Sequence, residues 1–300
     1  MKYADLSKKK RVVVKIGSSS LVHPQTGRLD YIKLDRLVRE ICDIRNRGMD
    51  VCLVSSGAIA VGRQTMGNQA MQAALRDRDG KSTVNMSERE LGVKQALASV
   101  GQARLMGAYQ QYFSEYGQTS GQVLMTKYSM LDDEALENVR NTFEQLFAMD
   151  VIPVVNANDT VSTYEIRFGD NDTLSALVTS VIGGDLLIIL SDIDGLFTGN
   201  PKDDPEAKLV EYVEDINEDI THMASSQPGS GMGTGGMVTK LKAARIATYS
   251  GADMIICNSS DVGILHRIFE DDYKGTFFKA NKDESFQIAD VLSEENEGNR

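Results

Sequence analysis

Basic residues are in the minority in this sequence, and their shortage excludes one class of function. The chain has 300 residues, with 32 lysines and arginines against 43 aspartates and glutamates, a formal net charge of −11. A nucleic-acid-binding protein needs a broad basic surface to neutralise phosphates, so we expect no nucleic-acid partner. An anionic ligand would have to rely on a few placed lysines and on backbone N–H groups.

Cysteine, histidine and long hydrophobic runs are also scarce. The three cysteines, Cys42, Cys52 and Cys257, have no CxxC spacing, which predicts reduced, packed thiols and a reducing compartment. None of the three histidines lies near another candidate ligand, so we predict no zinc site and no metal-binding residue. No run approaches eighteen uncharged apolar residues, and the basic N-terminus precedes only a strand-length apolar run. We therefore expect a cytoplasmic protein without a signal peptide or membrane partner.

What the sequence does contain is an alternation of strand-like and helical patterns. Short apolar runs predict buried strands at Val12–Ile16, Val51–Val54, Ile152–Asn156, Leu186–Ser191 and Met254–Cys257. Helical spacing predicts helices from an N-cap at Asp30 through Ile44, and at Glu90–Phe113, Asp132–Met149, Thr173–Ile182 and Met237–Tyr249. This alternation predicts an α/β fold with a mostly parallel central sheet between helices, in three αβα layers.

Two polar segments interrupt this alternation. Asn68–Ser87 predicts a surface loop or partly disordered insertion. Residues 281–300 are acidic and predict a solvated, disordered tail. Residues 1–280 show no internal repeat and no clear linker, and we expect them to form one domain.

Polar residues follow the predicted strands, where ligands of parallel sheets collect. Lys15 precedes a glycine and three serines and suits a phosphoryl group, although a strand-end lysine often only reaches solvent. Ser55-Ser56-Gly57 leads straight into a helix, which a simple serine cap would also explain.

The turns after the third and fourth predicted strands are richer still. Residues 156–160 and 169–172 crowd together Asn and Asp side chains, which suit an ammonium group and would orient basic residues near a reaction centre. Residues 191–197 are expected either to hold a nucleotide or to form an Asp-Gly turn.

A glycine-rich loop precedes the last predicted helix. Residues 229–236 include five glycines, and Lys240 falls in the first helical turn, where a lysine opposes the helix dipole unless an anion is bound. The standard nucleotide fingerprints fail, however. Gly80-Lys81-Ser82 lacks the first glycine of a Walker A loop, and the GxGxxG spacing of residues 231–236 follows no strand.

Six segments together resemble the amino-acid kinase superfamily, and within it most closely the glutamate 5-kinase family. They are VVVKIGSSSLV, SSGAIAVG, VGQARLM, NANDTVSTYEIRFGDNDTLSALV, LSDIDGLFTGNP and GMGTGGMVTKLKAA, in the expected order between about residues 12 and 280. The resemblance implies transfer of phosphate from ATP, with Mg²⁺, to the γ-carboxylate of L-glutamate, giving γ-glutamyl phosphate, the first step of proline biosynthesis. Because that carboxylate is already ionised near neutral pH, no general base is expected.

The resemblance also implies individual roles. Lys15 and Lys240 would neutralise charge on the transferring phosphoryl group, and Asp172 would hold both lysines in place. The implied glutamate-binding residues, mainly in the N-terminal part, are Ser56, Gly57, Asp159, Asp170 and Asn171. The implied ATP-binding residues, mainly in the C-terminal part, are Lys15, Ser191, Asp192, Thr234, Gly235, Gly236, Met237, Val238, Thr239 and Lys240.

Further expectations follow from the resemblance. It implies feedback inhibition by proline, a homodimer or homotetramer, and a reductase as the next enzyme. Many bacterial members of the family carry an added C-terminal RNA-binding-like domain, and we expect none in a chain of 300 residues. Two alternatives stay open: another carboxylate kinase of the superfamily, acting on aspartate or acetylglutamate, or a non-catalytic amino-acid sensor.

Overall fold

A single eight-stranded sheet organises the computed structural model, which describes residues 3–75, 86–126, 128–161, 171–201, 203–225 and 236–287. The strand order is β3-β4-β2-β1-β5-β7-β8-β6. All pairs from β3 to β7 are parallel, whereas β8 runs antiparallel to β7. The strands are β1 Arg11–Ile16, β2 Asp50–Ser55, β3 Thr119–Met125, β4 Val151–Ala157, β5 Leu186–Ser191, β6 Tyr212–Val213, β7 Asp253–Asn258 and β8 Gly275–Phe278.

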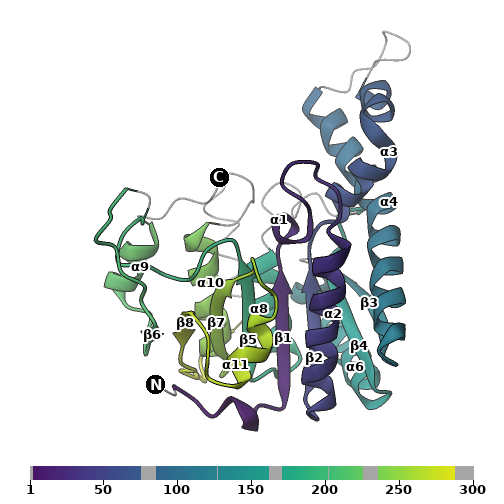
Figure 1. Ribbon diagram of the computed structural model, residues 1–300. Coiled ribbons are helices and arrows are strands. Elements are labelled where there is room, and N and C mark those ends of the chain that lie inside the picture. Colours follow the sequence, from purple (N-terminus) through teal and green to yellow (C-terminus); the bar gives the residue numbers. More distant parts are fainter. Residues whose placement is uncertain are drawn as a thin grey trace.

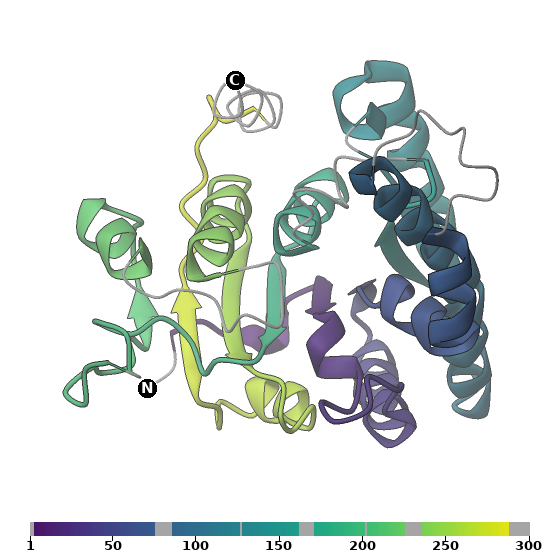
Figure 2. The same ribbon diagram turned by 90° about the horizontal axis from the view of Figure 1, so that it is seen from above.

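Helices cover both faces of this sheet, which confirms the predicted three-layer αβα arrangement (Figures 1 and 2). One face packs against α2, α4 and α11, and the other against α6, α8, α9 and α10. The helical elements are η1 Leu6–Lys8, α1 Ser18–Leu21, α2 Tyr31–Asn46, α3 Ala58–Leu75, α4 Met86–Glu115, α5 Tyr128–Leu131, α6 Asp133–Ala148, α8 Asn171–Val181, α9 Glu218–Ser225, α10 Met237–Tyr249 and α11 Ile264–Phe269.

The two-sided cover explains why the central strands contain continuous apolar runs with no polar residue inside them. Successive strand side chains point to opposite faces. In β1, Val12 and Val14 therefore belong to the core beneath α2 and α4, whereas Val13 belongs to the core beneath α8 and α10. All three are fully buried. An unbroken apolar run is what a parallel strand covered on both faces requires.

The predicted strands and most helices are confirmed to within one or two residues, and β5 and α10 match the predicted bounds. Asp30 caps α2 as expected, because its side chain accepts a hydrogen bond from the Lys33 N–H. No helix in the described part of the chain is long and apolar enough to cross a membrane.

The predicted loop at Asn68–Ser87 is wrong at both ends. Residues 68–75 belong to α3 and residues 86–87 to α4. The residues of the first stretch, NQAMQAAL, are mostly strong helix formers, and that preference prevails over their polar character. Residues 76–85 lie outside the described residues, as do residues 288–300 of the expected tail.

Helices α3 and α4 form a hairpin that projects beyond the sheet (Figure 1), and glycines let the two helices touch at its base. A Cβ atom on Gly62 would lie 1.9 Å from the Leu97 carbonyl oxygen, and one on Gly101 would lie 1.7 Å from the Ala58 carbonyl oxygen. No side chain fits at either position. Gly62 lies in the motif SSGAIAVG and Gly101 in the motif VGQARLM. These two glycines let α4 pack closely against the first turns of α3, which follow the end of β2.

Candidate active site

The carboxyl ends of the parallel strands bring the predicted site segments together. The Ser56 N–H, just after β2, donates to the Ile16 carbonyl at the end of β1 at 3.2 Å. The Ser259 N–H, just after β7, donates to the Ser191 carbonyl at the end of β5 at 2.6 Å. Strand β1 lies between β2 and β5. The chain adds β2, β4 and β3 on one side of β1 and adds β5, β7 and β8 on the other side, so β1 marks the topological switch point. Such a switch point is where open α/β sheets bind their ligands.

Two lysines from opposite parts of the chain meet on one carboxylate at this switch point. Lys15, in β1, is paired in register with Val54 and Ile189 on the flanking strands. Its Nζ donates to Asp172 Oδ1, and Lys240 Nζ donates to Asp172 Oδ2 at 3.0 Å. Asp172 is fully buried, and the two lysines are 7% and 4% exposed. The structure therefore brings the three predicted catalytic residues together.

The charges of these three residues indicate what the site would bind. Burial acts to raise the pKa of Asp172, but the ammonium groups of Lys15 and Lys240 outweigh it and lower that pKa to about 2. With Asp172 ionised, two positive charges face one negative charge. The first turns of α8 and α10 carry Asp172 and Lys240, and helix N-termini add partial positive charge. The arrangement favours a further anion such as a phosphoryl group.

Beside this cluster lies a polar group made of hydroxyl and amide side chains. Asn171, the first residue of α8, donates through Nδ2 to Ser56 Oγ and, at 3.2 Å, to Asn156 Oδ1. Asn156 is buried in β4, whereas Ser56, Asn171 and Asp159 are partly exposed. Gly57 has φ 111°, a conformation that favours glycine, and it turns the chain from β2 into α3. These groups can bind the carboxylate and ammonium groups of an amino acid.

The predicted nucleotide residues lie on the other side of β1. Ser191 ends β5 and donates to the Asp192 carboxylate at 3.2 Å. Of the residues that begin α10, Met237 is buried in the core, so any contact with a nucleotide would come from its backbone, whereas Val238 is 58% exposed. Thr239 Oγ1 donates back to the Gly236 carbonyl at 2.8 Å. Thr234, Gly235 and the predicted glutamate residue Asp170 lie outside the described residues.

Several residues that support this site were not among the individually predicted site residues. Ser20, in the serine-rich segment after β1, shares a buried hydrogen bond of 2.6 Å with Ser259 after β7. Ser259 could have been predicted as a site residue, because it follows the last predicted parallel strand, Met254–Cys257. Asn156 stood in the predicted polar cluster, but nothing in the sequence connected it with Gln102 of α4, whose Oε1 accepts from Asn156 Nδ2 at 2.9 Å.

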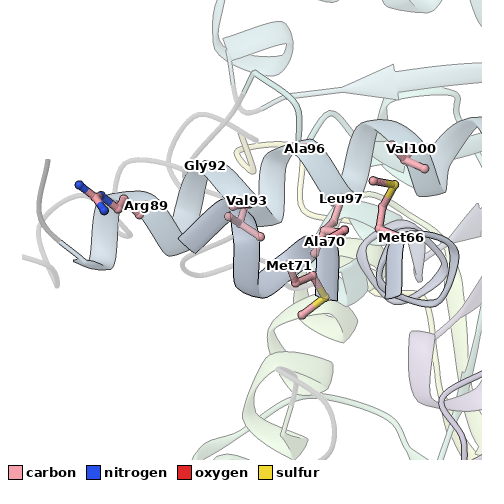
Figure 3. A pocket seen from close by; sticks show the side chains of 10 residues that line it. Met66, Ala70, Met71, Arg89, Gly92, Val93, Ala96, Leu97 and Val100 are labelled. Carbon is pink, nitrogen blue, oxygen red and sulfur yellow. The ribbon is translucent and has the colours of Figure 1, made fainter. Parts of the chain in front are cut away.

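A second pocket, of about 330 Å³, lies between α3 and α4 (Figure 3). Its lining includes Met66, Met71, Leu97 and Val100, with Arg89 at its outer end. Apart from Arg89, its lining side chains are apolar. It shares no lining residue with the cluster around Asp172, and its chemistry does not suit phosphate transfer.

Comparison with known proteins agrees with this geometry. Residues 10–258 match the amino acid kinase family. The chain is 43% identical over 273 residues to a glutamate 5-kinase of Clostridium acetobutylicum, covering 91% of this chain and 96% of that one. It is also 43% identical over 284 residues to a glutamate 5-kinase of Carboxydothermus hydrogenoformans, covering 95% and 72%.

Solved structures show the same fold at low sequence identity. An isopentenyl phosphate kinase superposes with a TM-score of 0.59 at 16% identity, covering 90% of this chain and 100% of that one. A UMP kinase from Ureaplasma parvum superposes with a TM-score of 0.58 at 13% identity, covering 91% and 99%.

Proposed function

This chain belongs to the amino acid kinase family and, within it, to the glutamate 5-kinases, and we propose that it phosphorylates the γ-carboxylate of L-glutamate with ATP. The observation that carries the proposal is the buried Lys15–Asp172–Lys240 cluster, with the polar side chains of Ser56 and Asn171 on one side of β1 and Ser191 on the other. We assign L-glutamate to the side of Ser56, Asp159 and Asn171, which the N-terminal part supplies, and ATP to the side of Ser191 and α10.

The reaction needs no proton transfer. A γ-carboxylate oxygen of glutamate forms a bond to the γ-phosphorus of ATP while the bond from that phosphorus to the β,γ-bridging oxygen breaks. The electron pair of the broken bond leaves with ADP, and γ-glutamyl phosphate remains. Since a carboxylate of pKa about 4 is ionised at neutral pH, it is a ready nucleophile without a general base.

Catalysis then depends on alignment and on neutralising charge. Two anions must approach each other, and the phosphoryl oxygens and the leaving oxygen carry negative charge as the bond breaks. Lys15 lies on β1 between these two groups of polar side chains, and Lys240 lies in the first turn of α10 on the nucleotide side. Their ammonium groups are therefore placed to stabilise this charge. Asp172 fixes both ammonium groups before substrate arrives, which avoids a reorganisation cost in the transition state.

Mg²⁺ is proposed to enter with ATP. Among the described residues no group of three or more His, Cys, Asp or Glu side chains is placed to hold a metal ion. Mg²⁺ commonly keeps several waters and binds through phosphate oxygens with one or two carboxylates, so this site fits an ion held mainly by ATP and water. When bound, the ion would neutralise phosphate charge.

Trapping of the product tests the proposal. Purified protein is mixed with ATP, Mg²⁺, L-glutamate and hydroxylamine, which converts an acyl phosphate into a hydroxamate. We expect glutamate-dependent hydroxamate and none with aspartate or N-acetylglutamate. The variant Lys240→Ala is expected to lose at least about 100-fold in kcat, because it removes a charge that stabilises the transition state. Equal turnover of aspartate and glutamate would refute the assigned substrate.

We further propose the regulation and assembly that the family resemblance implies. Proline is expected to inhibit the reaction, and the chain is expected to form a homodimer or homotetramer in the cytoplasm. The three cysteines are unpaired and buried, as suits a reducing compartment. Titration of hydroxamate formation with proline and light scattering of the purified protein test the first two statements.

A further inference from the structure

A chain of side-chain amides runs from the edge of the sheet into the proposed glutamate pocket. Gln102 Nε2, on α4, donates to Gln122 Oε1 on the edge strand β3 at 3.3 Å. Asn156 Nδ2, on β4, donates to Gln102 Oε1 at 2.9 Å. Asn171 Nδ2, at the start of α8, donates to Asn156 Oδ1 at 3.2 Å. In the order Gln122, Gln102, Asn156 and Asn171, each amide oxygen accepts a hydrogen bond from the amide nitrogen of the residue that follows.

One backbone group determines the direction of this chain. A side-chain amide can be turned over so that its oxygen and nitrogen exchange places, and only its partners decide which orientation is correct. The Ala157 N–H donates to Asn156 Oδ1 at 2.9 Å, and a backbone N–H can only donate. Asn156 must therefore present oxygen to Ala157 and Asn171, and nitrogen to Gln102. Gln102 in turn must offer its oxygen to Asn156.

This direction decides what the pocket offers a ligand. Asn171 uses its Nδ2 hydrogens on Asn156 and Ser56, so its Oδ1 is turned the other way, and no described residue donates to that oxygen. Ser56 Oγ accepts from Asn171, and its own proton has no acceptor among the described residues. The pocket thus presents an oxygen acceptor suited to an ammonium group and a hydroxyl donor suited to a carboxylate, which are the two groups of an amino acid.

We propose that Gln102 is a positioning residue for the amino-acid substrate. It does not line the reaction centre, but it satisfies the amide nitrogen of Asn156, which is 3% exposed. Without that acceptor, the buried amide nitrogen of Asn156 loses its partner, and the side chain gains by shifting to find another. Its oxygen is still bound by the Ala157 N–H but is displaced from the position that holds Asn171. The orientation of Asn171 and Ser56 for glutamate is then lost. This inference rests on the proposed function, because it assumes that glutamate binds beside Ser56 and Asn171.

Substitutions of Gln102 separate positioning from general damage. Gln102→Leu removes the acceptor, and we expect the KM for L-glutamate to rise about tenfold, the value of one hydrogen bond, while kcat and the KM for ATP stay within about twofold. Gln102→Glu keeps an oxygen facing Asn156, and its KM for glutamate is expected to remain within about threefold of wild type. Gln111→Leu, at an exposed position of the same helix, is the matched control and should leave all constants unchanged.

The possible results distinguish a wrong positioning role for Gln102 from a wrong proposed function. If Gln102→Leu raises the KM for glutamate no more than Gln111→Leu, or if Gln102→Glu is as impaired as Gln102→Leu, the positioning role is wrong. Should Gln102→Leu fail to fold, as judged by its melting temperature, Gln102→Met makes the same comparison. A wild-type protein that forms no hydroxamate and shows no calorimetric binding of L-glutamate overturns the proposed function itself, and the inference with it.

Discussion

Replacing Asp172 by asparagine perturbs the centre of the site without changing its volume. The amide has one acceptor oxygen, and its NH₂ group would face one of the two ammonium groups that the carboxylate now binds. Lys15 and Lys240, both less than 10% exposed, would then be two positive charges close together with no negative charge between them. Breaking a buried ion pair from one side leaves such a charge uncompensated, which is far more costly than replacing the whole pair.

Two estimates bracket the loss of stability. The pKa of Asp172 falls from an ordinary value of 3.8 to about 2, which corresponds to about 2 kcal/mol of stabilisation at neutral pH. Removal of one partner from a buried pair typically costs about 3–5 kcal/mol. We therefore expect Asp172→Asn to lower the free energy of unfolding by about 2–5 kcal/mol. We also expect kcat to fall about 100- to 1,000-fold, because both lysines lose their fixed positions.

The assay compares this variant with a largely buried ion pair at the amino end of a strand, away from the carboxyl ends that form the site. Asp253, at the start of β7, is 6% exposed and pairs with Lys9 at 2.7 Å. Asp253→Asn is expected to lower the free energy of unfolding in urea but to leave kcat for hydroxamate formation within about twofold. The reasoning is refuted if both variants lose activity in proportion to stability, or if Asp172→Asn keeps wild-type kcat.

Three further predictions follow from burial and geometry. The stability difference between wild type and Asp172→Asn should stay constant from pH 8 to pH 5, because a lowered pKa gives stability that is lost only as pH falls below about 4; urea titrations that show it shrinking by pH 5 would contradict this. Gly62→Ala should lower the melting temperature and the activity, because its Cβ would lie 1.9 Å from a carbonyl oxygen of α4. The control Gly107→Ala has open space around its Cβ and should be neutral or stabilising by up to about 1 kcal/mol. Burial raises the pKa of Cys42 and Cys257 to about 12, so a thiol reagent at pH 8 should label neither in the native protein and both in urea.

The sequence predicts best those elements whose pattern has a single physical reading. Strand β5 and helix α10 match their predicted bounds, since a fully buried strand needs a nearly continuous apolar run and the glycine-rich sequence before Met237 favours a helix start there. The catalytic cluster was only partly predictable from local sequence. Lys240 in a first helical turn opposes the helix dipole unless an anion is bound, but a strand-end lysine such as Lys15 often only reaches solvent. The joint roles of Lys15, Lys240 and Asp172 were expected from the family resemblance.

Elements at the edges of the sheet were harder to predict. Strand β3 contains Gly121 and the exposed Gln122. Among the described residues it pairs only with β4, so it lacks the apolar run of a central strand. Strand β8 is short and pairs antiparallel with β7, and this pairing cannot be recognised from the local sequence of β8. The proposed positioning role of Gln102 could not be predicted from the sequence, because it depends on contacts with β3 and β4 that no local pattern encodes.

The choice of lysine over arginine at positions 15 and 240 follows from the shared carboxylate. An ammonium group has three donors, and Asp172 takes one from each lysine. In the proposed reaction, the flexible four-carbon stem of each lysine would let its ammonium group follow the phosphoryl oxygens as the phosphoryl group moves from ATP to glutamate. A guanidinium is a planar fork that matches a carboxylate with two parallel hydrogen bonds. We therefore expect an arginine at either position to pair with both oxygens of Asp172 and displace the other cation, whereas two ammonium groups can share this carboxylate.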